Sequence, residues 1–120
     1  MEFIGLLSKG KGTWGQVIGL IKRENWEKII IIGDDYAKKT FDSLGIEKEV
    51  EFIKINLDKG IKELIEELKE KLKDKIKGLE VALSIASGDG KEHMAIISAL
   101  LNLPVGIKFA VLTKDGVILL

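Results

Sequence analysis

The sequence of 120 residues contains no cysteine, one proline and one histidine. The missing cysteines exclude disulfide bonds, thiol catalysis and cysteine-ligated zinc. No apolar run is long enough to span a bilayer, and Glu2 stands where a secretory signal carries positive charge, so we expect neither a membrane association nor a signal peptide. A cytoplasmic location is the expectation that follows.

An excess of either charge is also missing, because lysine plus arginine and aspartate plus glutamate each number 19. A neutral chain lacks the broad basic face that bulk DNA or RNA binding requires, but a local lysine cluster is enough for a small phosphate ligand. With 46% hydrophobic and 32% charged residues, the composition is typical of one globular domain spanning residues 1–120. Abundant isoleucine, lysine and glutamate favour a thermophile source.

Strand and helix patterns alternate along the chain. Apolar runs at 2–8 and 29–32 and an alternating run at 50–55 predict the first three strands. Helical spacing predicts helices at 14–24, 36–44 and 59–77, with Thr13 and Asp58 as expected N-caps of the first and third. The remaining expected elements are a strand at 79–86, a helix at 91–101, a strand at 106–112 and a short strand at 117–120 after an Asp-Gly turn.

This alternation predicts an α/β fold, a Rossmann-like three-layer sandwich. The expected sheet is mostly parallel, of order 3-2-1-4-5-6, with antiparallel edge strand 6. Strands 1 and 4 are then neighbours at the point where the winding reverses, and ligands bind there beyond the carboxyl ends of the strands. The two loops at this point, 8–13 and 87–91, both carry glycine and lysine.

The second of these loops has the chemistry of an anion site. A strand, a glycine turn and a helix start direct backbone N–H groups toward one spot. Its candidate ligand-binding residues are Ser87, Gly88, Asp89, Gly90, Lys91 and, one step further, His93. Asp89 or Ser87 is expected to cap the helix, and Lys91 adds a positive charge. Met94, Ile97 and Leu101, flanked by Ala95 and Ile96, are apolar residues at helical spacing. An ordinary turn between a strand and a helix is the alternative interpretation.

The first loop contributes the other candidates, which are Ser8, Lys9, Gly10, Lys11, Gly12 and Thr13. Gly5-x4-Gly10-Lys11 nearly matches a P-loop, but Gly12 replaces the serine or threonine that binds magnesium. Gly10, Gly12 and Gly15 share the spacing of a dinucleotide-binding turn, with Asp34 and Asp35 as the only acids closely following the second strand. Trp14 is expected in the core or stacked on a base.

Catalysis and metal binding have weaker signals. His93 has no second histidine or cysteine to complete a transition-metal site, and no cofactor is expected. Ser8, Thr13 and Ser87 have no base partner that would make a nucleophile. Asp34 and Asp35 are expected to form a strand-end turn and a helix cap, with the mouth of a cleft as the alternative.

The strand, turn and helix over 81–101 resemble those of the CARF domains, the Rossmann-like sensor domains of CRISPR-associated proteins. Their corresponding turn typically reads Thr-Gly-Gly-Thr-Lys and is followed by a helix of small and apolar residues. In this chain Ser87, Gly88 and Lys91 match that pattern, whereas Asp89 and Gly90 depart from it. Loop 8–13 falls where these domains place their other ligand loop, and the length and strand order agree over essentially the whole chain.

The resemblance implies a homodimer that binds a cyclic oligoadenylate across its two-fold axis, as part of CRISPR-linked signalling. Some relatives also cleave the ring without metal, and the candidates for such catalysis here are Lys11 and Lys91. Whether this chain is an enzyme stays open, and a binding module is the leading hypothesis. The alternatives are a ring nuclease and a structural or protein-binding domain without a small-molecule ligand.

Overall fold

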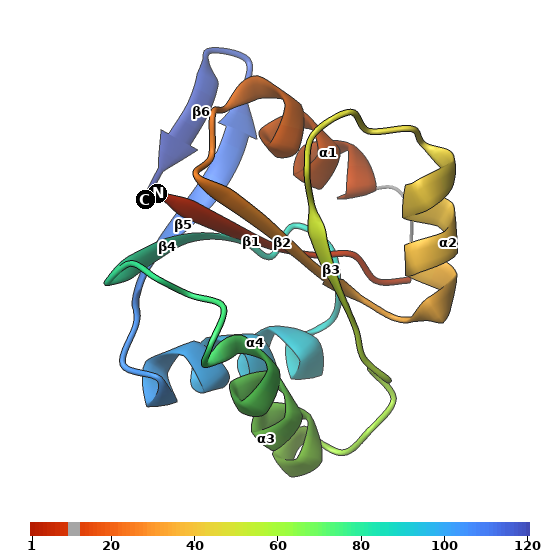
Figure 1. Ribbon diagram of the computed structural model, residues 1–120, viewed down its shortest axis with the longest axis vertical. Helices are drawn as coiled ribbons and strands as arrows, with labels where there is room; N and C mark the ends of the chain where they lie inside the picture. The colour runs from red at the N-terminus through yellow and green to blue at the C-terminus, as the bar shows by residue number, and fades with distance from the viewer. Residues whose placement is uncertain (10–12) are drawn as a thin grey trace.

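The computed structural model describes residues 1–9 and 13–120. Strands and helices alternate over most of these residues (Figure 1). In chain order the elements are β1 (Glu2–Leu6), α1 (Trp14–Arg23), β2 (Lys28–Gly33), α2 (Asp35–Ser43), β3 (Glu51–Lys54), α3 (Ile61–Leu72), β4 (Glu80–Ser84), α4 (Gly90–Asn102), β5 (Gly106–Thr113) and β6 (Gly116–Leu119). Within the described ranges, no helix is long and apolar enough to cross a membrane.

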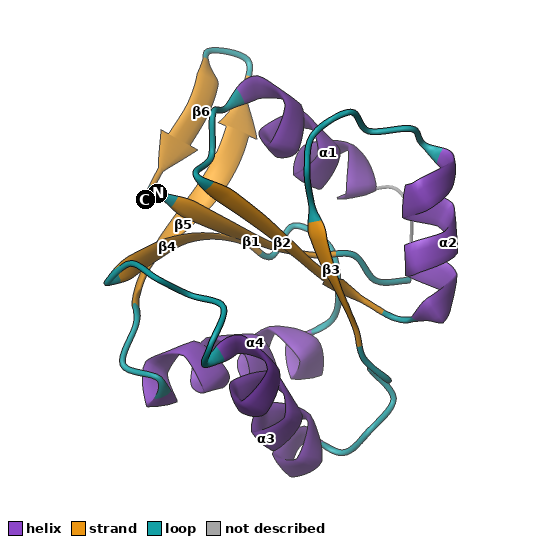
Figure 2. Ribbon diagram, viewed as in Figure 1, coloured by secondary structure: helices purple, strands orange, loops and turns teal. Residues whose placement is uncertain are grey.

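The strands form one sheet of order β3-β2-β1-β4-β5-β6. All neighbours are parallel except β5 and β6, which are antiparallel. Figure 2 shows the three layers, with α1 and α2 on one face of the sheet and α3 and α4 on the other. The predicted fold class, strand order and antiparallel edge strand are therefore confirmed.

Two apolar clusters hold the layers together. Ile4 and Ile30 face α3 and α4, whereas Phe3 and Ile31 face α1 and α2. Because successive side chains of a strand point to opposite faces, a strand that is covered on both sides must be apolar throughout. This explains why β1 and β2 are continuous apolar runs in the sequence.

The predicted end of the third helix is wrong. We expected a helix over 59–77 capped by Asp58, but α3 runs from Ile61 to Leu72 with Gly60 at its N-cap position. Thr13 does stand at the N-cap position of α1, although its side chain makes no capping hydrogen bond. α3 ends before residue 77 because the chain must turn back into β4. The apolar periodicity of the sequence does not contain that constraint.

The apolar residues predicted for the fourth helix divide between a buried and an exposed face. Met94 and Leu101 are 61% and 64% exposed, and the buried face consists of Ala95, Ile96, Ala99 and Leu100. Small alanine side chains allow the helix backbone to approach the sheet closely. Met94 and Leu101 are left on the outer side of α4.

A buried carboxylate fixes the turn between α3 and β4. Glu2, at the start of β1, is only 4% exposed. Its oxygens accept hydrogen bonds from the backbone N–H groups of Lys77 at 2.8 Å and Gly78 at 2.7 Å. A charged group that is buried needs such partners, so the start of β1 and the turn before β4 depend on each other.

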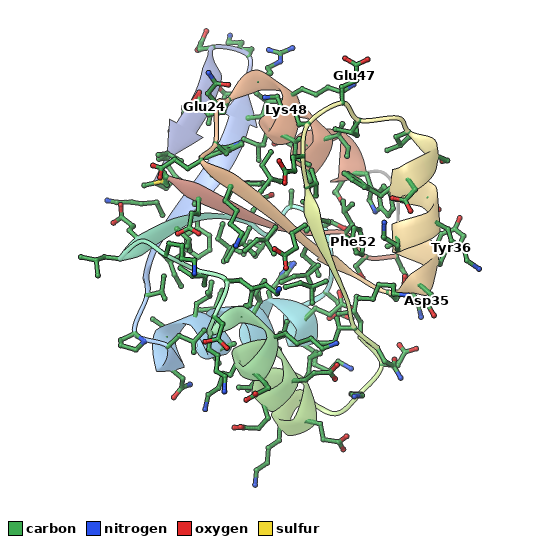
Figure 3. The ribbon with its side chains drawn as sticks, in the orientation of Figure 1. Glu24, Asp35, Tyr36, Glu47, Lys48 and Phe52 are labelled. Atoms are coloured by element: carbon green, nitrogen blue, oxygen red, sulfur yellow. The ribbon has the colours of Figure 1, made fainter. Side chains whose placement is uncertain are left out.

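We predict that Glu2→Gln destabilises the fold, because one oxygen that accepts hydrogen bonds is replaced by an amide that donates them. The expected loss in the free energy of unfolding is about 1–3 kcal/mol. Urea denaturation measures it, with Glu47→Gln as the matched control because Glu47 is exposed (Figure 3). Equal midpoints for the two variants would contradict the role assigned to Glu2.

Candidate ligand-binding site at the carboxyl edge of the sheet

The two loops that carry glycine and lysine meet at their first residues. They follow β1 and β4, which are adjacent parallel strands, so both loops begin at the same edge of the sheet. The backbone N–H of Ser8 donates a hydrogen bond of 2.9 Å to the Ser87 side-chain oxygen. Ser8 is 8% exposed and Ser87 is fully buried, so the hydrogen bond that joins the two loops lies inside the protein and away from solvent.

Ser87 and His93 hold the second loop together internally. The His93 ring nitrogen Nε2 lies 2.8 Å from the Ser87 carbonyl oxygen. A carbonyl oxygen only accepts, so this contact assigns the ring proton to Nε2. His93 therefore links the first turn of α4 to Ser87, which lies in the loop before the helix.

Gly88 is the residue that makes the turn geometrically feasible. Its φ is +106°, a backbone conformation that favours glycine. A Cβ atom at this position would lie 2.5 Å from Leu6 Cδ2 and 2.8 Å from Glu92 Oε1. The turn passes this close to β1 because residue 88 has no side chain.

The N-terminus of α4 is capped by the chain's own carboxylates. Asp89 accepts a 2.8 Å hydrogen bond from the Glu92 backbone N–H, and Glu92 accepts a 3.0 Å hydrogen bond from the Asp89 N–H. Asp89 thus caps the helix as expected, and Ser87 does not. The sequence analysis missed Glu92, although the spacing Asp-x-x-Glu is the known signature of a capping box. These carboxylates occupy part of the anion position that the sequence predicted for a ligand.

Lys9 of the first loop and Lys91 of the second reach the same third loop, between β3 and α3. Lys91 Nζ donates a 2.7 Å hydrogen bond to the carbonyl oxygen of Lys59. Lys9 Nζ lies 3.6 Å from Asp58 Oδ1, and both of these side chains are largely exposed. Since Asp58 and Lys59 are consecutive, Lys9 and Lys91 lie on the same side of the candidate site.

The Lys59 ammonium is directed away from these two lysines. It pairs with Glu67 of α3, and its hydrogen bond lowers the pKa of that carboxyl group, which burial opposes. The same hydrogen bond raises the pKa of Lys59. Lys59 thus belongs to the α3 ion pairs, and its backbone, not its side chain, takes part in the site.

The remaining predicted residues of the first loop divide into two groups. Gly10, Lys11 and Gly12 lie outside the described residues, so the predicted meeting of Lys11 with Lys91 is not tested. Thr13 is exposed at the start of α1. Trp14 belongs to the core, at 6% exposed, and its Nε1 donates to the Ser8 carbonyl oxygen at 2.9 Å.

The two aspartates after β2 have structural partners. Asp34 caps α2 by accepting a 2.8 Å hydrogen bond from the Ala37 N–H, and Asp35 lies 3.4 Å from Lys54 Nζ. Figure 3 shows Asp35 and Tyr36 at the start of α2. They line a separate cavity of about 480 Å³. In the part of the chain that the structure describes, no cluster of histidine, aspartate and glutamate could hold a metal ion.

Neither a scan against models of protein families nor a search of curated proteins finds a match to this chain.

We predict that Gly88→Ala destabilises the protein strongly, because the new Cβ both strains a positive φ and overlaps Leu6 and Glu92. The expected loss in the free energy of unfolding is about 1–3 kcal/mol, read from urea denaturation. Gly90→Ala is the matched control, since a Cβ at that position meets nothing within 4 Å. The assigned turn geometry is contradicted if both alanine variants unfold at the same urea concentration.

Proposed function

We propose that this chain is a nucleotide-binding sensor module of the CARF type. Loops 8–13 and 87–91 bind the phosphate and ribose groups of a cyclic oligoadenylate. The observation that carries the proposal is the buried hydrogen bond from Ser8 N–H to Ser87 Oγ, which joins the two loops where the winding of the sheet reverses. Ligands of doubly wound sheets bind at this position.

The positive charge of Lys91 supports a phosphate ligand. Its partner, the Lys59 carbonyl, is neutral, so the hydrogen bond holds the ammonium in place without cancelling its charge. The ion pair of Lys9 with Asp58 is solvent-exposed, and such pairs contribute little, so Lys9 can exchange Asp58 for a phosphate. Asp89 caps α4 by accepting a hydrogen bond from the Glu92 N–H, so the positive charge that attracts the ligand comes from Lys9 and Lys91.

A homodimer is part of the proposal, and the outer face of α4 supports it. Met94, Ile97 and Leu101 lie on one side of the helix, where Met94 and Leu101 are more than half exposed. Residues 94–102 contain no charged side chain. A two-fold contact places the same surface against itself, so an uncharged face avoids repulsion between like charges.

The neighbouring helix shows that this apolar face is not general to the layer. Figure 1 shows α3 beside α4 on the same side of the sheet. The outer positions of α3 are Lys62, Glu63, Glu66 and Glu70, all exposed and charged. A helix face that meets only water is normally polar in this way, so α4 has the surface of a helix with a partner.

We predict that cyclic tetra-adenylate or cyclic hexa-adenylate binds with micromolar or tighter affinity and that Lys91→Ala weakens the binding. A hydrogen bond to a charged group contributes about 1.5–3 kcal/mol, so the dissociation constant should rise by about 10- to 100-fold. Isothermal titration calorimetry measures both values.

The matched control for Lys91→Ala is Lys48→Ala. Lys48 Nζ also donates to a backbone carbonyl, that of Glu24 at 2.9 Å, but it does so at the amino edge of the sheet (Figure 3). The Lys48→Ala variant therefore loses a comparable hydrogen bond outside the candidate site. Its affinity for the cyclic ligands should equal that of the unmodified protein. Absence of heat with either ring would overturn the proposal and leave a domain whose loops are ordinary turns.

We predict that Leu101→Lys converts the dimer to a monomer, because it places two like charges at the two-fold contact. Light scattering coupled to size-exclusion chromatography measures the mass. Leu44→Lys is the matched control, since Leu44 is 48% exposed at the end of α2, on the opposite face of the sheet. A monomeric unmodified protein, or a dimer that survives Leu101→Lys, would contradict this assignment of the interface.

A further inference from the structure

An apolar groove of about 380 Å³ borders the 87–91 turn on the side of β5. Ile85 and Ala86, the two residues that precede Ser87, form one wall. Phe109 and Val111 of β5, together with Leu120, form the other. The groove is thus continuous with the turn that we propose for phosphate binding.

The groove exists because β5 is longer than the strand beside it. β4 pairs with β5 only as far as Phe109, whereas β5 continues to Thr113 and pairs there with β6. The β4 side of the second half of β5 therefore has no neighbouring strand. Figure 2 shows β5 and β6 continuing past the rest of the sheet.

Gln16 of α1 takes the place of the missing strand. Its side-chain nitrogen donates a 2.9 Å hydrogen bond to the Leu112 carbonyl, and its side-chain oxygen accepts a 3.1 Å hydrogen bond from the Leu112 N–H. The backbone of β5 is satisfied in this way without a strand that would fill the space above it. Among the residues that the structure describes, Gln16 is the only polar side chain that lines the groove, and both its side-chain nitrogen and its side-chain oxygen are hydrogen-bonded.

The lining determines which part of a ligand fits. No charged side chain within 1–9 and 13–120 lines the groove, so burying a phosphate among these residues would remove it from water without compensation. A flat, uncharged ring instead gains contact with apolar side chains and with the ring of Phe109, which is only partly buried. The volume also lies in the range of small-molecule sites.

We infer that this groove holds the nucleobase of the ligand whose phosphate is bound by the 87–91 turn. The inference rests on the proposed function, because the phosphate site sets where the base begins. The site then has two chemically distinct halves. Lys9 and Lys91 bind the phosphate, and the apolar wall from Ile85 to Ala86, opposite Phe109, binds the base.

The test compares two ligands that differ only by the base, adenosine monophosphate and ribose 5-phosphate. Nuclear magnetic resonance titration measures both dissociation constants for the unmodified protein, for Lys91→Ala and for Ala86→Phe, which fills the groove from an exposed position. We expect adenosine monophosphate to bind at least about tenfold more tightly, as stacking of a base on an aromatic side chain provides. Ala86→Phe should remove this difference, and Lys91→Ala should weaken both ligands alike.

Phe109→Leu is a second variant that keeps the strand apolar and removes only the aromatic ring, and it should reduce the difference between the two ligands severalfold. Equal affinity of the unmodified protein for both ligands would overturn the nucleobase assignment and leave the phosphate site standing. A preference for adenosine monophosphate that survives both groove variants would also overturn it. If neither ligand binds, the proposed function fails together with the inference.

Discussion

The parallel pairing of β1 with β4 is the constraint on which the rest of the structure depends. It places two loops that are far apart in the sequence at one edge of the sheet. The buried hydrogen bond between Ser8 and Ser87 then locks their relative position. Because both residues are buried, water competes little for this hydrogen bond. The first residues of the two loops are therefore held in one position relative to each other.

Two kinds of charged side chain determine the electrostatics at this edge of the sheet: carboxylates that cap α4, and a lysine that no carboxylate neutralises. Asp89 and Glu92 compensate backbone amides at the start of α4, so the helix end offers an anion less than an uncapped helix would. Lys91 retains its full charge because its partner is a carbonyl oxygen. The positive potential at the candidate site therefore comes from lysine side chains more than from the helix dipole.

Surface chemistry separates the two helices of one layer. The outer face of α3 carries ion pairs such as that of Glu70 with Lys73, which directly follows the helix. The outer face of α4 instead contains Met94 and Leu101. The candidate site and the apolar outer face both lie on α4. The site is at the N-terminus of the helix, and the apolar face begins one turn later, at Met94.

The sequence by itself determined the α/β class, the strand order and the position of both loops, because continuous apolar runs such as 29–32 and glycine turns are local signals. Tertiary structure decided what local patterns do not contain. Met94 and Ala95 are both apolar, and only the packing of α4 on the sheet shows which one is buried. Asp58 was expected to cap a helix, but the path of the chain into α3 places Gly60 there. The partner of Lys91 and the groove beside Phe109 likewise follow from where separate strands end in space, which no spacing along one segment encodes.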